Sequence, residues 1–222
     1  MNLLLTSAGL RNGSLLDALQ QMLDKPIAES RIVYVPTASM AEPGDHGWLV
    51  ADLRRVHDLG WQELDVLELN GLPRHIVIER LLRADVIYVG GGNHYHLARS
   101  VARNDLAGAL LDALQSRIYV GVSAGAMIFS RNLTERSAEV IGDIADLHVL
   151  GASVLEPPFG LFDWYLKPHL FSPDFPQRDL AWAEDIAARA DFPMYFIDDQ
   201  TAIRVRGDEI DVVSEGRWRF YP

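Results

Sequence analysis

The sequence predicts an α/β protein, a three-layer sandwich in which helices cover both faces of a mostly parallel central sheet. Short apolar runs alternate along the chain with segments of helical period. The apolar runs are hydrophobic at every position rather than at every second one, which is typical of strands buried on both faces. With 222 residues, 49% of them hydrophobic, the chain is long enough for one large core. We therefore expect a single domain over residues 1–222.

Five strands are expected in the first part of the chain, because these short runs are mostly rich in Val, Ile, Leu and Tyr. They are Leu3 to Thr6, Arg31 to Pro36, Glu63 to Leu69, Asp85 to Val89 and Arg117 to Val122. Between them, apolar side chains recur at helical spacing. The predicted helices are Ser14 to Leu23, Trp48 to Leu59, Arg74 to Arg83 and Leu106 to Gln115.

The last third of the chain is less regular. Residues Glu139 to Phe175 have glycine, proline and aromatic residues without a clear period, so irregular backbone with short strands is expected. Arg178 to Ala190 has the pattern of a helix and Pro193 to Ile197 that of a strand. The C-terminal segment predicts short antiparallel strands joined by tight turns, at Thr201 to Val205, Ile210 to Val213 and Arg217 to Phe220.

The composition disfavours several functions. The chain has 20 basic and 31 acidic residues, a net charge of −11, and no basic cluster, so nucleic acid and anionic membranes are not expected as partners. It has no cysteine, which excludes disulfides, a thiolate nucleophile and cysteine-bound metal. Residues Met1 to Ser7 lack a basic region, and their apolar run is too short for a signal peptide or membrane span. We therefore expect a cytoplasmic protein that acts on small molecules or peptides.

A serine stands between two glycines in the segment Gly121-Val122-Ser123-Ala124-Gly125, where a strand should end and a helix begin. This matches the nucleophile-elbow pattern, in which the glycines permit a tight turn that raises the serine hydroxyl above the sheet edge. A serine at such a turn can also be an ordinary N-cap that satisfies a free backbone N–H. These residues alone leave both interpretations open.

Three glycines, Gly90 to Gly92, follow the strand that ends at Val89. Backbone N–H groups there could point into the crevice at the carboxyl edge of the sheet and hold an oxyanion. A tight turn against the next strand is the alternative. A dinucleotide site is less attractive, because the third glycine of G-x-G-x-x-G is missing. His94 and His96 would point to different sides of a helix, so one of them could line the pocket but a shared metal is not expected.

A serine nucleophile needs a group that takes its proton, and the chain has seven histidines. His169 follows an apolar run and Pro168, which fixes the backbone before it, so His169 is the preferred base. A half-buried loop histidine is the alternative. Asp198 and Asp199 follow a later apolar run and could supply a carboxylate, although two adjacent acids are also common in turns.

Taken together, these features resemble peptidase family S51, which contains the aspartyl dipeptidases and is related to the cyanophycinases. The resemblance rests on four motifs in order over nearly the whole chain: a GGGN turn, a G-x-S-A-G elbow, an aromatic-rich stretch ending in Pro-His, and a late Asp-Asp-Gln-Thr-Ala-Ile segment. It implies a class I glutamine amidotransferase-like fold in which serine replaces the cysteine of the amidases. It also implies Ser-His-Asp or Ser-His-Glu catalysis without metal or cofactor.

The resemblance assigns roles residue by residue. Ser123 is the expected nucleophile, His169 the general base, and Asp199 the carboxylate that orients the base, with Asp198 as the alternative. Aspartate stands here where glutamate is expected in the dipeptidases. Since aspartate is one methylene shorter, its loop must lie closer to the histidine.

The remaining candidate residues would contact the substrate. Backbone N–H groups would form the oxyanion hole, from Ala124 and from Gly91 or Gly92. An arginine can bind a carboxylate with two parallel hydrogen bonds, whereas a surface arginine is more simply solvated. The candidates for substrate binding are Asn93, His94, Arg131 and Arg136.

The resemblance implies a serine peptidase of small peptides, a dipeptidase or exopeptidase for which aspartyl dipeptides are candidate substrates, acting through an acyl-enzyme. Two alternatives stay open. One is a non-peptidase member that binds a small metabolite in the same crevice. The other is a cyanophycinase-like hydrolase of β-aspartyl peptides. The apolar residues Trp218, Phe220 and Tyr221 also suggest a homodimer.

Overall fold

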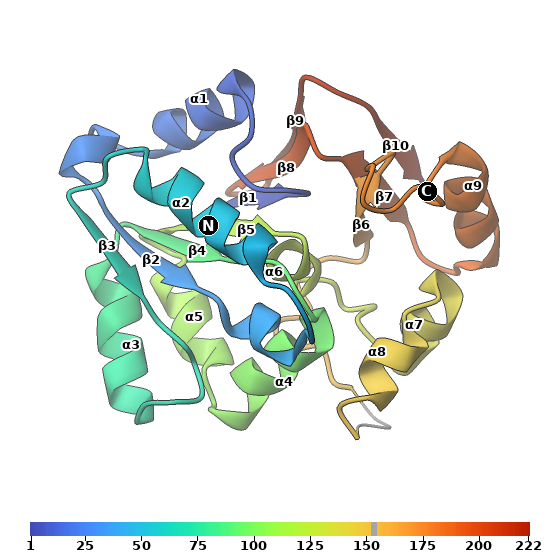
Figure 1. The fold of residues 1–222 in the computed structure, drawn as a ribbon, viewed down its shortest axis with the longest axis horizontal. Coiled ribbons are helices and arrows are strands. Elements are labelled where there is room, and N and C mark those ends of the chain that lie inside the picture. Colours follow the sequence, from blue (N-terminus) through green and yellow to red (C-terminus); the bar gives the residue numbers. More distant parts are fainter. Residues whose placement is uncertain (152–154) are drawn as a thin grey trace.

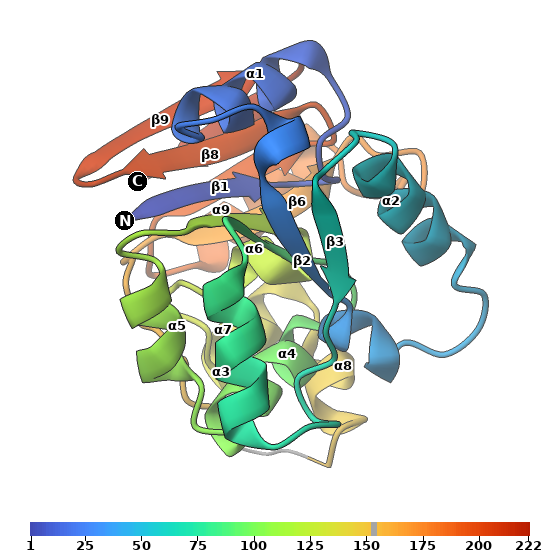
Figure 2. The ribbon, with the colours of Figure 1, turned by 90° about the vertical axis from the view of Figure 1, so that its left-hand side faces the viewer.

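The computed structural model describes residues 1–151 and 155–222 and has the expected three-layer α/β architecture (Figures 1 and 2). The central sheet contains seven strands in the order β3-β2-β4-β5-β1-β8-β9. Its parallel strands are β1 (Asn2–Thr6), β2 (Arg31–Val35), β3 (Glu63–Val66), β4 (Val86–Val89) and β5 (Ile118–Val122). The antiparallel strands β8 (Thr201–Arg206) and β9 (Glu209–Ser214) extend the sheet beyond β1.

Burial on both faces explains why the parallel strands are uniformly apolar. In β1, Leu3, Leu4 and Leu5 are all 0% exposed, although successive side chains of a strand point to opposite faces. Leu3 and Leu5 contribute to the core on one side of the sheet, and Leu4 contributes to the core on the other side. The strand therefore needs an apolar residue at every position.

Helices from consecutive crossovers form the two outer layers (Figure 2). One core contains residues of α1 (Gly13–Met22) and α2 (Gly47–His57). The other core contains residues of α3 (Arg74–Arg83), α4 (His94–Arg103), α5 (Ala107–Ala113) and the short helix α6 (Ala124–Met127). Two short 3-10 helices, η1 (Ile27–Glu29) and η2 (Thr37–Ala41), lie before and after β2. Within the described residues, no helix combines the length and hydropathy that crossing a bilayer requires.

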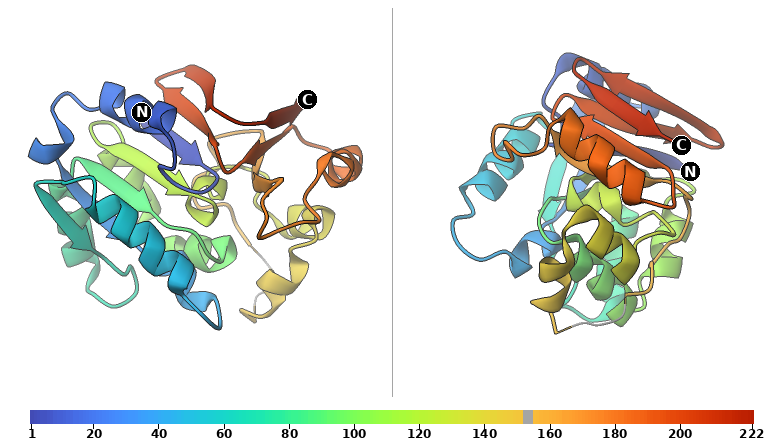
Figure 3. Two further views of the ribbon diagram at one scale, coloured as in Figure 1. Left: turned by 45° about the horizontal axis from the view of Figure 1, so that its top comes forward. Right: turned by 90° about the vertical axis from the view of Figure 1, so that its right-hand side faces the viewer.

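A second, smaller sheet lies beside the first and has the order β10-β7-β6 (Figure 3). Strands β6 (Tyr165–Leu170) and β7 (Met194–Asp198) are parallel, and β10 (Trp218–Tyr221) is antiparallel to β7. Helix α9 (Leu180–Arg189) packs on this sheet, where its Trp182 meets Phe196 edge-on. Trp218 and Phe220 are 38% and 41% exposed. The suggested homodimer stays a prediction.

The sequence-based description of Glu139 to Phe175 was wrong in one respect. This part of the chain holds not only β6 but also the helices α7 (Glu135–Ile141) and α8 (Ile144–His148), whereas residues 152–154 of the predicted segment lie outside the described residues. Helix α7 starts at a capping box between Thr134 and Ser137 and ends at Gly142, whose φ is 80°. Both helices are too short to display the repeated apolar spacing by which longer helices are recognised.

The two glycines that flank Ser123 are required by close backbone packing. A Cβ on Gly121 would lie 2.6 Å from the carbonyl oxygen of Gly125. A Cβ on Gly125 would lie 2.3 Å from the carbonyl oxygen of Val89. These neighbours are backbone atoms of buried strands and of the elbow itself, so they cannot move away as a flexible side chain would.

We expect Gly121→Ala to lower the free energy of unfolding by about 1–3 kcal/mol, because the added methyl group overpacks the elbow. Urea unfolding measures this change. Gly108→Ala is the matched control, since Gly108 lies in α5 and has nothing within 4 Å of its Cβ position. That variant should be neutral or stabilised by up to about 1 kcal/mol. Equal losses in both variants would contradict the packing argument.

Candidate active site

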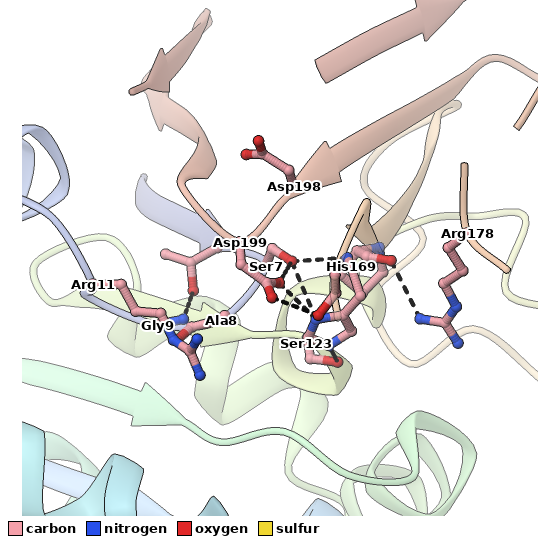
Figure 4. A network of polar contacts seen from close by, with 12 residues as sticks. Ser7, Ala8, Gly9, Arg11, Ser123, His169, Arg178, Asp198 and Asp199 are labelled. Atoms are coloured by element: carbon pink, nitrogen blue, oxygen red, sulfur yellow. Dashed lines mark hydrogen bonds and ion pairs between the residues drawn. The ribbon is translucent and has the colours of Figure 1, made fainter. Parts of the chain in front are cut away.

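Ser123 occupies the sharp turn between β5 and α6. Its φ of 47° and ψ of −106° are a conformation that a residue with a side chain rarely adopts. Its hydroxyl makes no hydrogen bond to the first turn of α6, so the side chain does not act as an N-cap. The Oγ atom instead lies 2.9 Å from Nε2 of His169 (Figure 4). The elbow therefore presents the hydroxyl to an imidazole.

His169 reaches Ser123 from the second sheet. It lies in β6, where the pairing with β7 shifts register between Lys167 and Leu170, and its φ is 66°. Its Nδ1 atom lies 2.8 Å from Oδ1 of Asp199. A carboxylate only accepts hydrogen bonds, so Nδ1 carries the hydrogen in this pair. The Nε2 atom is then free to accept the hydroxyl hydrogen of Ser123.

Asp199 lies in the turn between β7 and β8 and accepts three side-chain hydrogen bonds. Besides Nδ1 of His169, the hydroxyl of Ser7 donates to Oδ1 at 2.8 Å and the hydroxyl of Ser172 donates to Oδ2 at 2.8 Å. Burial alone would raise the pKa of Asp199, but the bonds from His169, Ser172 and Ser7 outweigh it and hold the pKa far below its usual value. The carboxylate is therefore ionised at neutral pH.

The neighbouring Asp198 is directed elsewhere (Figure 4). Its carboxylate accepts hydrogen bonds from the Thr201 hydroxyl at 2.7 Å and from the backbone N–H groups of Gln200 at 3.1 Å and Arg217 at 2.6 Å. These bonds hold the turn after β7 against the segment that leads into β10. The structure thus brings Asp199, and not Asp198, to His169.

Two of the residues predicted to form the oxyanion hole adjoin Ser123. Ala124 is the first residue of α6, so its N–H has no acceptor within the helix. Gly91 adjoins the elbow, because a Cβ built on it would lie 3.5 Å from Cβ of Ser123. Gly92 has a φ of 128°, and a Cβ built there would lie 2.4 Å from the carbonyl oxygen of Ala38, so Gly92 packs against η2. Of the two glycines, Gly91 is the one beside Ser123.

Comparison with known proteins identifies the family. A sequence model of peptidase family S51 matches residues 3–213. The chain belongs to this family. Peptidase E of Streptomyces coelicolor is 29% identical over 234 residues, which cover 100% of this chain and 87% of that protein. An uncharacterized peptidase of Pasteurella multocida is 26% identical over 190 residues, covering 82% of this chain and 84% of the relative.

Two solved structures share the fold. A protein of Listeria monocytogenes EGD-e, assigned as a candidate peptidase E, superposes with a TM-score of 0.77 at 21% identity, covering 97% of this chain and 98% of that one. A peptidase from an acI-B1 actinobacterium gives a TM-score of 0.68 at 20% identity, covering 99% of this chain and 90% of that one. As a member of family S51, the protein is a serine hydrolase of the peptidase class.

Two of the predicted substrate residues have structural contacts in this S51 peptidase. Asn93 caps α4, because its Oδ1 accepts from the N–H of His96 at 2.9 Å, and its amide donates to the carbonyl of Asp146 at 3.2 Å. His94 is buried, with Nε2 3.3 Å from the hydroxyl of Tyr165. Burial lowers the pKa of His94 to about 3, so the ring is neutral.

The two predicted arginines lie on the surface. Arg131 is exposed beside the bridge between Ser130 and Phe162. Arg136 is exposed on α7, with its guanidinium 3.8 Å from Glu139 and 3.5 Å from the carbonyl of Arg189. Neither arginine contacts Ser123, His169 or Asp199 in the described part of the chain.

The structure instead places a different arginine near His169. The ring of Phe175 stacks on the imidazole of His169 at a centroid distance of 5.0 Å, and the guanidinium of Arg178 lies 3.9 Å from the centroid of the same ring. Arg178 also donates to the carbonyl of Pro168 at 3.3 Å. No carboxylate of residues 1–151 or 155–222 forms an ion pair with Arg178. Arg178 is the first residue of the predicted helix Arg178 to Ala190 and precedes the observed helix α9, yet its position in the sequence does not reveal its place beside His169.

A buried ion pair lies close to His169 in the chain. The ammonium of Lys167, whose side chain is 2% exposed, contacts the carboxylate of Asp143. Burial lowers the pKa of Lys167, and for Asp143 the attraction of Lys167 outweighs burial and lowers the pKa of the carboxyl. The pair joins the start of α8 to β6, the strand that carries His169.

We expect Lys167→Met to lower the free energy of unfolding by about 3–5 kcal/mol, because it leaves the Asp143 carboxylate buried without its cation. Replacing both partners, as in Lys167→Met with Asp143→Leu, should restore most of this loss. Urea unfolding measures both variants. Arg136→Met, which removes only exposed contacts to Glu139 and to the carbonyl of Arg189, should change stability by less than about 1 kcal/mol. A loss in Lys167→Met no larger than that of the control would contradict this prediction.

Proposed function

We propose that the protein is a dipeptidase or exopeptidase of small peptides that acts through Ser123, His169 and Asp199. The observation that carries this proposal is the continuous chain of hydrogen bonds between them, 2.9 Å from Oγ to Nε2 and 2.8 Å from Nδ1 to Oδ1. Such a chain can activate a serine, since the imidazole takes the hydroxyl proton and the carboxylate stabilises the resulting imidazolium.

The proposed reaction has two stages. Oγ of Ser123 attacks the peptide carbonyl while Nε2 of His169 takes its proton, and the carbonyl oxygen becomes an oxyanion near the N–H groups of Gly91 and Ala124. The C–N bond then breaks as His169 gives the proton to the leaving amine, which leaves an ester on Ser123. Water, deprotonated by His169, attacks this ester, and the acid product leaves as the proton returns to Oγ.

We further propose that the substrate carries an acidic residue, as in aspartyl dipeptides. Arg178 supports this choice, because its guanidinium lies beside the ring that stacks on His169 and, within the described residues, no carboxylate partner lies within ion-pair distance of it, although Asp143, Asp146 and Asp199 attract it from farther away. A substrate carboxylate would supply that partner through charge-assisted hydrogen bonds. Membership of family S51, which contains aspartyl dipeptidases, is consistent with such a substrate.

Ser123→Ala should lower peptide hydrolysis by at least about 10⁴-fold and abolish labelling by a fluorophosphonate probe, because no nucleophile remains. Circular dichroism and thermal unfolding should stay close to those of the wild type. Labelling detected by gel fluorescence and hydrolysis of a dipeptide library are the measurements. Undiminished turnover by Ser123→Ala would refute the proposed mechanism.

Arg178→Met should lower kcat/KM for Asp-Leu by about 10- to 100-fold, the loss expected when a charged group loses its hydrogen-bond partner. Hydrolysis of Ala-Leu, which has no side-chain carboxylate, should change by less than about threefold. Arg136→Met is the control and should leave both peptides unaffected. A parallel screen with β-Asp-Leu separates α-aspartyl from β-aspartyl specificity. An equal loss on Asp-Leu and Ala-Leu would show that Arg178 does not read an acidic side chain.

A further inference from the structure

The carboxyl end of β1 touches all three segments that carry the proposed triad. The carbonyl of Thr6 accepts the N–H of Ser123 at 3.0 Å. The N–H of Ser7 donates to the carbonyl of Thr201, two residues after Asp199, at 3.2 Å. Thr6 pairs with the end of β5 on one side and with the start of β8 on the other. Thr6, the last residue of β1, and Ser7, which follows it, thus connect parts of the chain that are far apart in sequence.

The side chain of Ser7 adds two further bonds at the centre of the site (Figure 4). Its hydroxyl donates to Oδ1 of Asp199 at 2.8 Å and accepts the backbone N–H of His169 at 2.8 Å. It also lies 3.4 Å from Nδ1 of His169. Ser7 is 0% exposed, so water does not replace these bonds. One hydroxyl therefore fixes the carboxylate and the backbone of the histidine that the carboxylate orients.

The bond to the N–H of His169 acts on a strained backbone. His169 has a φ of 66°, in the left-handed region that residues with a side chain rarely occupy, and Phe171 has a φ of 58°. This geometry turns the imidazole out of the β6 ladder toward Ser123. An unbonded N–H at such a buried position would favour a return to ordinary strand geometry.

We infer that Ser7 is a positioning residue of the active site, which holds the imidazole of His169 and the carboxylate of Asp199 in register with Ser123. This inference rests on the proposed function. Ser172 differs from Ser7, because its hydroxyl bonds only Oδ2 of Asp199 and does not bond His169. Ser7 alone bonds both members of the His-Asp pair through its side chain, within the described residues.

The test measures the reactivity of Ser123 toward a fluorophosphonate. This measurement does not require that the peptide substrate be known. Ser7→Ala should lower the maximal labelling rate, kinact, by roughly 100-fold, the loss typical of an approximately 1 Å misplacement of a catalytic group. The probe's KI should stay within about twofold, because Ser7 is 0% exposed and therefore cannot touch the probe. A mere loss of folded protein would lower the amount of labelled product, and not the rate constant of the folded fraction.

Ser137→Ala is the matched control. Ser137 is also 0% exposed, and its hydroxyl likewise donates one bond, to the Thr134 carbonyl at 2.8 Å, and accepts one, from the Thr134 N–H at 3.0 Å. It lies in α7, outside the proposed triad. Thermal unfolding should show a loss of stability in Ser137→Ala as in Ser7→Ala, whereas kinact should stay at the wild-type value. If Ser7→Ala does not fold, the near-isosteric Ser7→Cys replaces it, with the same decrease in kinact expected.

A double-mutant cycle with Asp199→Ala completes the experiment. Since Ser7 acts through the His-Asp pair, its replacement in the Asp199→Ala background should lower kinact by less than about threefold. Two results would overturn the role of Ser7 without affecting the proposed function: the wild type labels and Ser7→Ala has the same kinact, or Ser7→Ala lowers kinact by the full roughly 100-fold in the Asp199→Ala background as well. Failure of the wild type to label would overturn the proposed function itself.

Discussion

Hydrogen bonding at the carboxyl end of β1 is the interaction on which the site depends. Ser123, His169 and Asp199 come from a βα turn of the central sheet, from a strand of the second sheet and from the turn that joins the two sheets. The pairing of β6 with β7, which sets Leu170 opposite Asp198, brings His169 and Asp199 close to each other but does not bring them to Ser123. Backbone bonds from Thr6 and Ser7 place the elbow and the β7–β8 turn on either side of β1. The side chain of Ser7 then reaches across to β6.

Backbone strain is concentrated where these segments meet. Ser123, His169 and Phe171 all have positive φ values, at 47°, 66° and 58°. Each such residue costs of order 1–3 kcal/mol and persists only where the surroundings fix it. The surroundings here are rigid: glycines packed against backbone at the elbow, and the buried pair of Lys167 and Asp143 beside β6. The stability of the two cores thus offsets the cost of the strained backbone that directs the side chains of Ser123 and His169 toward each other.

The sequence predicts the parts of this arrangement that leave a pattern over several neighbouring residues. The uniformly apolar strands predict the parallel sheet, because burial on both faces requires an apolar residue at every position. The elbow is recognisable because Ser123 lies between glycines at the end of a strand. Ser7 and Ser172 are not part of such a pattern, since a single serine that will be buried cannot be distinguished in the sequence from any other serine. Arg178 was missed for a related reason: its partner Phe175 and the imidazole meet only in the folded chain. The arginines chosen from sequence, Arg131 and Arg136, follow the elbow in the chain, and within the described residues neither forms a hydrogen bond or ion pair with Ser123, His169 or Asp199.

The geometry of His169 lets an aspartate reach its imidazole. An aspartate at position 199 extends one methylene less from the β7–β8 turn than a glutamate would, yet Nδ1 of His169 lies 2.8 Å from its Oδ1. The register shift in β6 and the left-handed backbone of His169 bring the ring to the carboxylate. A carboxylate on a short side chain has little freedom to adjust, so its position must be set by other donors. The hydroxyls of Ser7 and Ser172 do this from opposite oxygens, and the same two bonds help to keep Asp199 ionised beside the imidazole.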